Sequence, residues 1–302
     1  MRIGMVGLGR MGMNMALRLV QDGHVVTAFD RSSERTKKAE GLGIKGAYTL
    51  EALASALPSP KAVWLMVPAG EAVDSTIAVL KKGLVPGDII IDGGNSFYKD
   101  SLRRHKDLAA IGIHFIDAGV SGGIWGLTEG YCIMAGGEAA VCGLIGPIFK
   151  SLAQEGGYLR CGGPGSGHFV KMAHNGIEYG LMEAYAEGFE LMKASGYGEE
   201  LDLKNIARLW MRGSVVRSWL LELLETALSR DPGLSAISGF VEDSGEGRWT
   251  VKEALDLSVS LPVITEALFR RFRSRQDDSF AEKVLAALRK EFGGHSVKPE
   301  GE

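Results

Sequence analysis

The feature that most constrains the fold is a glycine-rich turn that lies between a short apolar strand and a helical pattern at the start of the chain. The strand is expected at Arg2–Val6, and the turn after it runs from Gly7 to Gly12 with the spacing GxGxxG. A second strand, His24–Phe29, ends at Asp30. Such a turn lets a pyrophosphate approach the backbone at a helix N-terminus, and an acidic residue that closes the second strand is typical of the same unit. Residues 1–30 therefore predict a Rossmann-type dinucleotide-binding domain.

Asp30 also bears on the choice of cofactor. Its carboxylate would accept hydrogen bonds from the adenosine ribose hydroxyls and repel a 2′-phosphate, which favours NAD. Arg31 beside it could tolerate that phosphate, so NADP is possible, and a glycine turn that serves packing alone is the alternative interpretation. The expected cofactor-binding residues are Gly7, Gly9, Arg10, Met11, Gly12, Asp30, Arg31, Val67 and Asn95.

Strands continue to alternate with helices, and several of them end at small or polar residues. These strands are expected at Ala62–Val67, Asp88–Ile91, His114–Asp117 and Tyr131–Ala135. Because strand ends line the ligand crevice of an open parallel sheet, Asn95 after the second of them is placed to face cofactor and substrate. Ser121, Gly122 and Gly123 follow the third, where a hydroxyl and close backbone approach are available. A plain turn remains the alternative at both places.

The alternation stops near Gly165, and helices dominate the rest of the chain. The expected helices are Lys171–Ala194, Leu203–Met211, Val215–Ser229, Lys252–Val259, Val263–Arg273 and Phe280–Phe292, with a loop at Ser235–Trp249. The expected architecture is thus α/β, a Rossmann-type domain over residues 1–164 followed by an all-helical C-terminal domain over residues 165–302.

The first of these helices carries an unusual polar face. At about 100° per residue, Lys171, His174, Asn175 and Glu178 fall within one sector of a helix that is otherwise apolar. An amine, an imidazole, an amide and a carboxylate on one face are suited to acid–base chemistry. A solvated helix face is the competing interpretation, and spacing alone does not decide between them.

Composition excludes several classes of function. The chain has 302 residues and a net charge of −3, which gives no electrostatic footprint for nucleic acid or an anionic membrane. No apolar run approaches the roughly 20 residues of a membrane span, and the amino terminus does not have the pattern of a signal peptide. The three cysteines lack metal-ligand spacing, so no metal site is expected. A cytoplasmic location follows as the default expectation.

Seven motifs occur in an order that is typical of one family. They are Gly7–Gly12, Asp92–Ser96, Gly119–Gly123, Lys171–Tyr179, Trp210–Gly213 with Arg217-Ser218, Gly247–Thr250, and Glu266–Phe269 with Arg271. With the tail Phe292-Gly293-Gly294-His295, they cover nearly the whole chain, which resembles decarboxylating 6-phosphogluconate dehydrogenase. In length it is similar to the short bacterial form, which lacks the larger helical C-terminal part of the long form.

The resemblance implies oxidative decarboxylation of 6-phosphogluconate to ribulose 5-phosphate, a step of the pentose phosphate pathway and of gluconate utilization. Lys171 matches the base that takes the proton of the 3-hydroxyl, and Glu178 matches the acid that protonates C1. The remaining matched substrate ligands are Asn95, Ser121, Gly122, Gly123, His174 and Asn175. No metal is implied, because a β-keto acid decarboxylates with its own carbonyl as electron sink.

The resemblance also implies a phosphate site and self-association. Tyr179 and Arg271 match phosphate ligands, whereas Ser244 stands where the long form has a phosphate-binding lysine. Arg289 and His295 match residues that reach the active site from a neighbouring subunit, which implies at least a homodimer. The substrate would be a small phosphorylated sugar acid, and Ser244 leaves open whether Arg248 compensates, phosphate binding is weaker or the substrate differs.

Two other functions compete with this one. A β-hydroxyacid dehydrogenase for a small 3-hydroxy acid would share the nucleotide fold, the Ser-Gly-Gly loop and the helix lysine. We would not expect it to carry His174, Glu178 and Tyr179 together, nor the Arg289–His295 tail. A non-catalytic NAD-binding sensor would be expected to have lost Lys171 or Glu178, and both are present.

Overall fold

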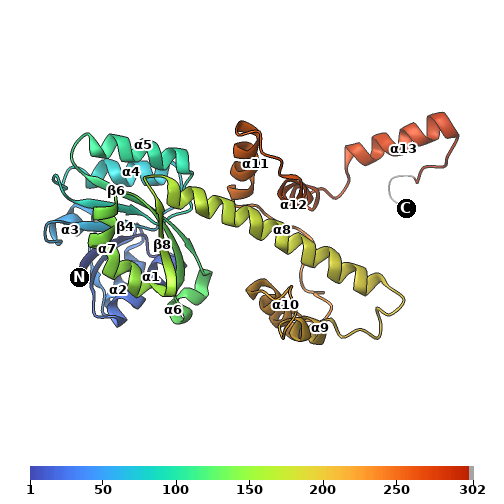
Figure 1. Cartoon of the computed structure of the whole chain (residues 1–302), viewed down its shortest axis with the longest axis horizontal. Coiled ribbons are helices and arrows are strands. Elements are labelled where there is room, and N and C mark those ends of the chain that lie inside the picture. Colours follow the sequence, from blue (N-terminus) through green and yellow to red (C-terminus); the bar gives the residue numbers. More distant parts are fainter. Residues whose placement is uncertain (299–302) are drawn as a thin grey trace. The chain divides into compact units, whose positions relative to one another are not determined.

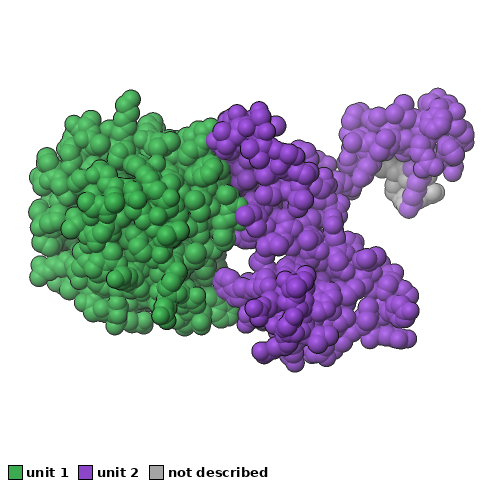
Figure 2. Space-filling view, viewed as in Figure 1, with its two compact units in different colours: residues 1–175 green, residues 176–302 purple. Residues whose placement is uncertain are grey.

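The computed structural model describes residues 1–298, and these fall into two compact units. The first unit is Met1–Asn175 and the second begins at Gly176 (Figure 2). The division between them lies inside one long helix, α8 (Ser166–Ala194). The domain limits expected from the sequence, residues 1–164 and 165–302, stay a prediction.

The first unit is built on an eight-stranded sheet with the order β3-β2-β1-β4-β5-β6-β7-β8. Neighbouring strands from β3 to β6 are parallel, β7 is antiparallel to β6, and β8 is parallel to β7. The strands are β1 (Arg2–Val6), β2 (Val25–Phe29), β3 (Lys45–Gly46), β4 (Ala62–Leu65), β5 (Ile89–Asp92), β6 (His114–Ser121), β7 (Tyr131–Gly136) and β8 (Ala153–Gly162). This is the Rossmann-type sheet that the sequence predicts.

Helices cover both faces of this sheet (Figure 1). One apolar cluster joins the sheet to α1 and α7, and a second joins it to α3, α4 and α5. The central strands β4 and β5 are buried along their whole length, which explains their nearly continuous apolar sequence. The helices are α1 (Arg10–Gln21), α2 (Ser33–Glu40), α3 (Leu50–Ser55), α4 (Glu71–Leu80), α5 (Tyr98–Ala109), α6 (Gly126–Glu129) and α7 (Ala139–Leu152), with a short 3₁₀ turn at Gly123–Trp125.

The second unit is helical in the part of the chain that the structure describes. The later half of α8 packs against α9 (Leu203–Trp210) and α10 (Trp219–Arg230) through a cluster that includes Phe189 and Leu221. A smaller cluster around Tyr179 joins α8 to α11 (Glu246–Asp256) and α12 (Pro262–Arg273). The last helix is α13 (Phe280–Gly293). Among the described residues, no helix is both long enough and apolar enough to cross a membrane.

Several expected boundaries were wrong. Strand β8 was not expected, because it lies at the edge of the sheet and much of it is exposed, so it lacks an apolar pattern. Helix α8 begins at Ser166 instead of Lys171, and α10 begins at Trp219 instead of Val215. Helix α11 starts inside the segment expected to be a loop, at Glu246. Gly245 before it has a positive φ of 90°, so the glycine that suggested a loop marks the helix start.

Candidate active site

The glycine-rich turn after β1 brings two backbone segments very close together. Gly7 has a φ of +94°, and a Cβ on it would lie 2.4 Å from the carbonyl oxygen of Met66. A Cβ on Gly12 would lie only 2.0 Å from the carbonyl oxygen of Gly7. By contrast, a Cβ on Gly9, which immediately precedes α1, meets nothing within 4 Å. The turn is therefore tight on its inner side and open at the start of α1, which fits a pyrophosphate at a helix N-terminus.

Asp30 ties this turn to the end of β2. Its carboxylate accepts hydrogen bonds from the backbone N–H of Leu8 at 2.7 Å and of Ser32 at 2.8 Å. The guanidinium of Arg35 lies 3.6 Å from the same carboxylate. Arg31, which was also expected to bind the cofactor, is exposed. Because a carboxylate offers about four acceptor sites, capacity remains for a ribose hydroxyl. Asp30 thus has a structural role in the turn that the motif alone does not reveal.

The loops after β4 and β5 carry two further expected ligands, Val67 and Asn95. A Cβ on Gly94 would lie 2.8 Å from the carbonyl oxygen of Val67, so the two loops are in direct contact. The buried carboxylate of Asp92 accepts hydrogen bonds from the Gly94 N–H at 3.1 Å and the Ser96 hydroxyl at 2.7 Å. The loop after β5 folds around this carboxylate, and Asn95 between the two donors is exposed.

The loop with the Ser-Gly-Gly sequence lies at the end of β6. Ser121 is the last residue of the strand and is half-buried. Gly122 has a φ of +122°, a backbone conformation that residues other than glycine rarely adopt. The glycine therefore turns the chain sharply just after the Ser121 hydroxyl.

Lys171 lies at the closest approach of α8 to β6. A Cβ on Gly119 would lie 2.3 Å from the Cβ of Lys171, and Lys171 itself is only 5% exposed. Its Nζ donates a hydrogen bond to Asn175 Oδ1 at 2.5 Å, and His174 Nδ1 lies 3.0 Å from the same oxygen. Since an amide oxygen only accepts hydrogen bonds, we assign a proton to Nδ1 of His174, which makes this nitrogen the donor. Three of the four residues of the predicted polar face are thus joined at one amide oxygen.

A residue that the sequence analysis missed, Asp117, holds the start of α8. Its carboxylate, in β6 and fully buried, accepts hydrogen bonds from the backbone N–H groups of Gly165 at 2.6 Å and His168 at 2.8 Å. Burial raises the pKa of Asp117, and the His168 ring and these backbone hydrogen bonds oppose that effect. The His168 ring in turn lies 2.7 Å from the Ser101 hydroxyl through its Nδ1. The only sequence signal was the position of Asp117 at the end of an expected strand.

Within the second unit, a pocket of about 360 Å³ holds the expected phosphate ligands. The Arg271 guanidinium lies 3.6 Å from the centroid of the Tyr179 ring, and its Nη1 donates to the carbonyl oxygen of Glu242 at 3.0 Å. The Tyr179 hydroxyl accepts a hydrogen bond from the Ser244 N–H at 3.2 Å. The pocket is lined by Glu178, Tyr179, Met182, Glu242, Asp243, Ser244 and Arg271.

Arg248 is bound to one of the carboxylates that line this pocket. Its Nε and Nη2 donate to Asp243 at 2.8 Å and 3.1 Å, and Arg275 donates to the same carboxylate at 2.7 Å. The hydrogen bond from Arg248 is the main cause that lowers the pKa of Asp243 to about 2, although burial opposes it. Arg248 does not line the pocket. The other two expected substrate residues, Arg289 and His295, are exposed on α13 and just after it.

Comparisons with known proteins cover both units of the chain. A family model described as the NAD binding domain of 6-phosphogluconate dehydrogenase matches residues 2–163, and one for the C-terminal domain of 6-phosphogluconate dehydrogenase matches residues 167–298. The Bacillus subtilis (strain 168) protein YqeC is 44% identical over 298 residues, which are 99% of each chain. The NAD(+)-dependent, decarboxylating 6-phosphogluconate dehydrogenase of Haloferax volcanii is 42% identical over 299 residues, with 98% of each chain covered.

Solved structures agree with these relatives. The 6-phosphogluconate dehydrogenase of Plasmodium falciparum superimposes with a TM-score of 0.83 at 30% identity, over 100% of this chain and 67% of that one. A Mycobacterium tuberculosis 3-hydroxyisobutyrate dehydrogenase, at 23% identity and a TM-score of 0.74, shares the fold. Because both family models match and a relative aligns over nearly its whole length, the chain belongs to the 6-phosphogluconate dehydrogenase family.

Proposed function

We propose that this chain catalyses the oxidative decarboxylation of 6-phosphogluconate to ribulose 5-phosphate and CO2, with NAD as the preferred acceptor and NADP as a possible one. The observation that carries the proposal is Lys171, a buried amine packed against Gly119 and hydrogen-bonded to Asn175. The Haloferax volcanii relative is NAD(+)-dependent, which agrees with the preference expected from Asp30. The cytoplasmic location and the pathway expected from the sequence belong to the same proposal.

The oxidation begins at the 3-hydroxyl of the substrate. NAD, held by the glycine-rich turn and Asp30, would accept the hydride from C3. Lys171 in its neutral form takes the hydroxyl proton, and its hydrogen bond to Asn175 Oδ1 orients the amine. The Ser121–Gly123 segment would bind the substrate carboxylate, and Asn95 the substrate beside the cofactor.

The decarboxylation uses the same lysine in its charged form. The ammonium of Lys171 polarises the new 3-keto oxygen while CO2 leaves, so the electron pair of the broken C1–C2 bond flows toward that carbonyl. Glu178 then donates a proton to the carbon that has lost CO2. The two residues are seven positions apart on the continuous helix α8, a rise of about 10 Å along its axis.

The phosphate of the substrate is assigned to the pocket with Tyr179 and Arg271. A guanidinium binds phosphate well, and stacking on the Tyr179 ring orients the Arg271 group. The Ser244 hydroxyl supplies a hydrogen-bond donor but no charge in place of the long form's lysine. Arg248 compensates poorly for that loss, because Asp243 engages it through two nitrogens. We therefore assign the charge complementary to the phosphate to Arg271.

The active form is proposed to be at least a homodimer in which Arg289 and His295 complete the site of a neighbouring subunit. Helix α13, which carries Arg289, has no buried residue. Phe280 and Phe292 on it are each 80% exposed, and apolar surface of this kind marks interaction sites. Analytical ultracentrifugation tests this part, and a protein that is fully active while monomeric would contradict it.

The test of the whole proposal is an absorbance assay of nicotinamide reduction with the purified chain. Turnover of 6-phosphogluconate with NAD, with release of one CO2 per reduced nicotinamide, is the expected result. Unphosphorylated gluconate and NADP are the comparison substrates, and Lys171→Ala is the inactive control. Faster turnover of gluconate or of a small 3-hydroxy acid would refute the assignment of the phosphate pocket and favour a β-hydroxyacid dehydrogenase.

A further inference from the structure

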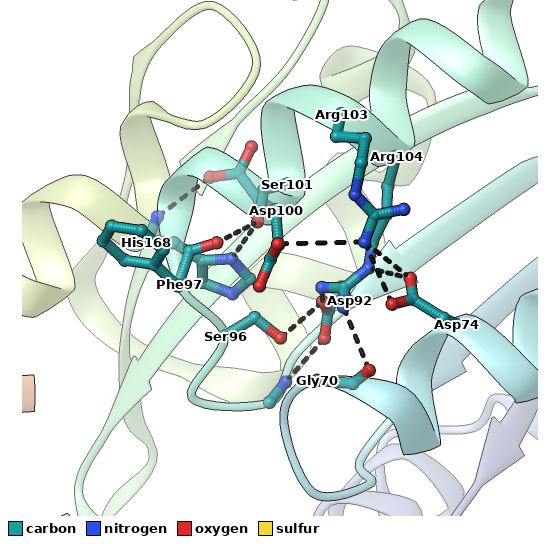
Figure 3. A network of polar contacts seen from close by, with 12 residues as sticks. Gly70, Asp74, Asp92, Ser96, Phe97, Asp100, Ser101, Arg103, Arg104 and His168 are labelled. Carbon is teal, nitrogen blue, oxygen red and sulfur yellow. Dashed lines mark hydrogen bonds and ion pairs between the residues drawn. The ribbon is translucent and has the colours of Figure 1, made fainter. Parts of the chain in front are cut away.

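Helix α5 carries a buried arginine, Arg104, whose side chain joins three separate segments of the first unit (Figure 3). Its Nε donates to Asp74 Oδ1 at 2.8 Å, its Nη2 to the carbonyl oxygen of Gly70 at 3.1 Å, and its Nη1 to Asp92 Oδ2 at 3.3 Å. The side chain of Arg104 is 1% exposed and that of Asp92 is 0% exposed. Because all three nitrogens donate hydrogen bonds and the side chain is buried, the guanidinium is held in one orientation.

The three partners of Arg104 lie in or directly beside the two loops that carry expected cofactor ligands. Gly70 ends the loop after β4, which contains Val67, and Asp74 lies in the first turn of α4 behind it. Asp92 ends β5 and organises the loop that contains Asn95. These two loops are already in contact at Gly94, and Arg104 links both of them to helix α5.

The neighbouring Arg103 provides a natural comparison. Its Nη2 contacts both oxygens of Asp74, at 3.0 Å and 2.9 Å, and its side chain is 50% exposed. Its other ion pairs are with Asp100 and Asp107, both on α5 itself. Arg103 thus shares one carboxylate with Arg104 but otherwise pairs within its own helix, and exposed ion pairs of this kind contribute little to stability.

We propose that Arg104 is a positioning residue, which fixes the loops of Val67 and Asn95 relative to each other and so sets the nicotinamide against the substrate. The consequence for turnover rests on the proposed function. An arginine is required because a lysine, with one nitrogen, retains the charge but cannot reach Asp74, Asp92 and the Gly70 carbonyl together. The charge alone is therefore insufficient.

The experiment compares Arg104→Lys and Arg104→Met with Arg103→Lys and Arg103→Met in the full chain. We measure kcat, KM for both substrates, the dissociation constant of NAD and the isotope effect with substrate deuterated at C3. Arg104→Lys is expected to lower kcat by about 10- to 100-fold, because a misplacement of about 1 Å costs that much. Its isotope effect rises as hydride transfer becomes slower, whereas both Arg103 variants stay within about twofold of the wild type.

Hydrogen exchange gives a readout that does not depend on turnover. In Arg104→Lys, the backbone amides of the two loops, residues 66–70 and 92–97, are expected to exchange faster. The amides of the strands that do not adjoin these loops are expected to keep their rates. A loss of activity that only follows the fraction of folded protein, with an unchanged isotope effect, would overturn the proposal. So would an Arg104→Lys protein with wild-type kcat.

The failure of the proposed function is distinguishable from the failure of this inference. If the wild type does not turn over 6-phosphogluconate, the function is wrong, and Arg104 is then judged by NAD affinity and hydrogen exchange. Weaker NAD binding with faster exchange in the two loops, absent in the Arg103 variants, would support the positioning role. Unchanged values in Arg104→Lys would refute it.

Discussion

Gly119→Ala tests how closely the base of the reaction is held against the sheet. A Cβ at this position would lie 2.3 Å from Lys171 Cβ, 2.9 Å from Lys171 Cγ and 3.0 Å from the carbonyl oxygen of Gly167. Carbon atoms in contact are ordinarily about 3.5–4.0 Å apart. The new methyl group therefore demands that α8 and β6 separate by more than 1 Å, on the order of the shortfall in the first contact.

The structure indicates that this separation is costly. The Cβ of Lys171 is fixed to the helix backbone, and the Gly167 oxygen is backbone itself, so neither can move alone. The start of α8 is also held by the Asp117 carboxylate. Overpacking of this kind costs about 1–3 kcal/mol of the free energy of unfolding. A base displaced by about 1 Å is expected to lower kcat by about 100-fold, which corresponds to about 2.7 kcal/mol in the activation free energy.

The assay combines thermal unfolding with steady-state kinetics. Gly143→Ala is the matched control, because Gly143 is exposed in α7 and a Cβ there meets nothing within 4 Å. This control is expected to gain about 0.5–1 kcal/mol of stability and to keep its kcat. A Gly119→Ala protein with wild-type unfolding temperature and kcat within about twofold would show that the close approach of Lys171 to β6 is wrong.

Four further predictions concern the roles of individual residues. Lys171→Ala is expected to abolish oxidation but to leave the NAD dissociation constant nearly unchanged. Glu178→Ala is expected chiefly to slow the formation of ribulose 5-phosphate, which product analysis measures. Normal turnover of either variant would contradict the role assigned to the residue that it replaces. Gly12→Ala places a Cβ 2.0 Å from the Gly7 oxygen, so titration should show NAD affinity reduced at least about tenfold. The carboxylate of Asp243 has a pKa of about 2, below its usual range, so the stability it contributes is present above about pH 4 and is lost as pH falls toward 2. Acid unfolding of Asp243→Asn should show a smaller decline over that interval, and an equal decline would refute the assignment.

Local patterns account for what was predicted correctly. The glycine turn, the apolar strands and the acidic residue after β2 are local signals, and they led to the observed, mostly parallel sheet. The polar face of α8 was visible because a helix repeats at a known angle, and Lys171, His174 and Asn175 do meet at one amide oxygen. Strand β8 was missed because an exposed edge strand has no apolar pattern to detect.

The sequence by itself determined the fold class, the family and the residues proposed to carry out the reaction, since each of these depends on motifs of a few neighbouring residues. Only the tertiary structure decided what holds those residues in place. Asp117, which holds the start of α8, and Arg104, which holds the cofactor loops, act on partners that are 12 to 51 positions away in the chain. Buried carboxylates and guanidinium groups must find hydrogen-bond partners wherever the fold supplies them, and such pairings leave no periodic trace in the sequence.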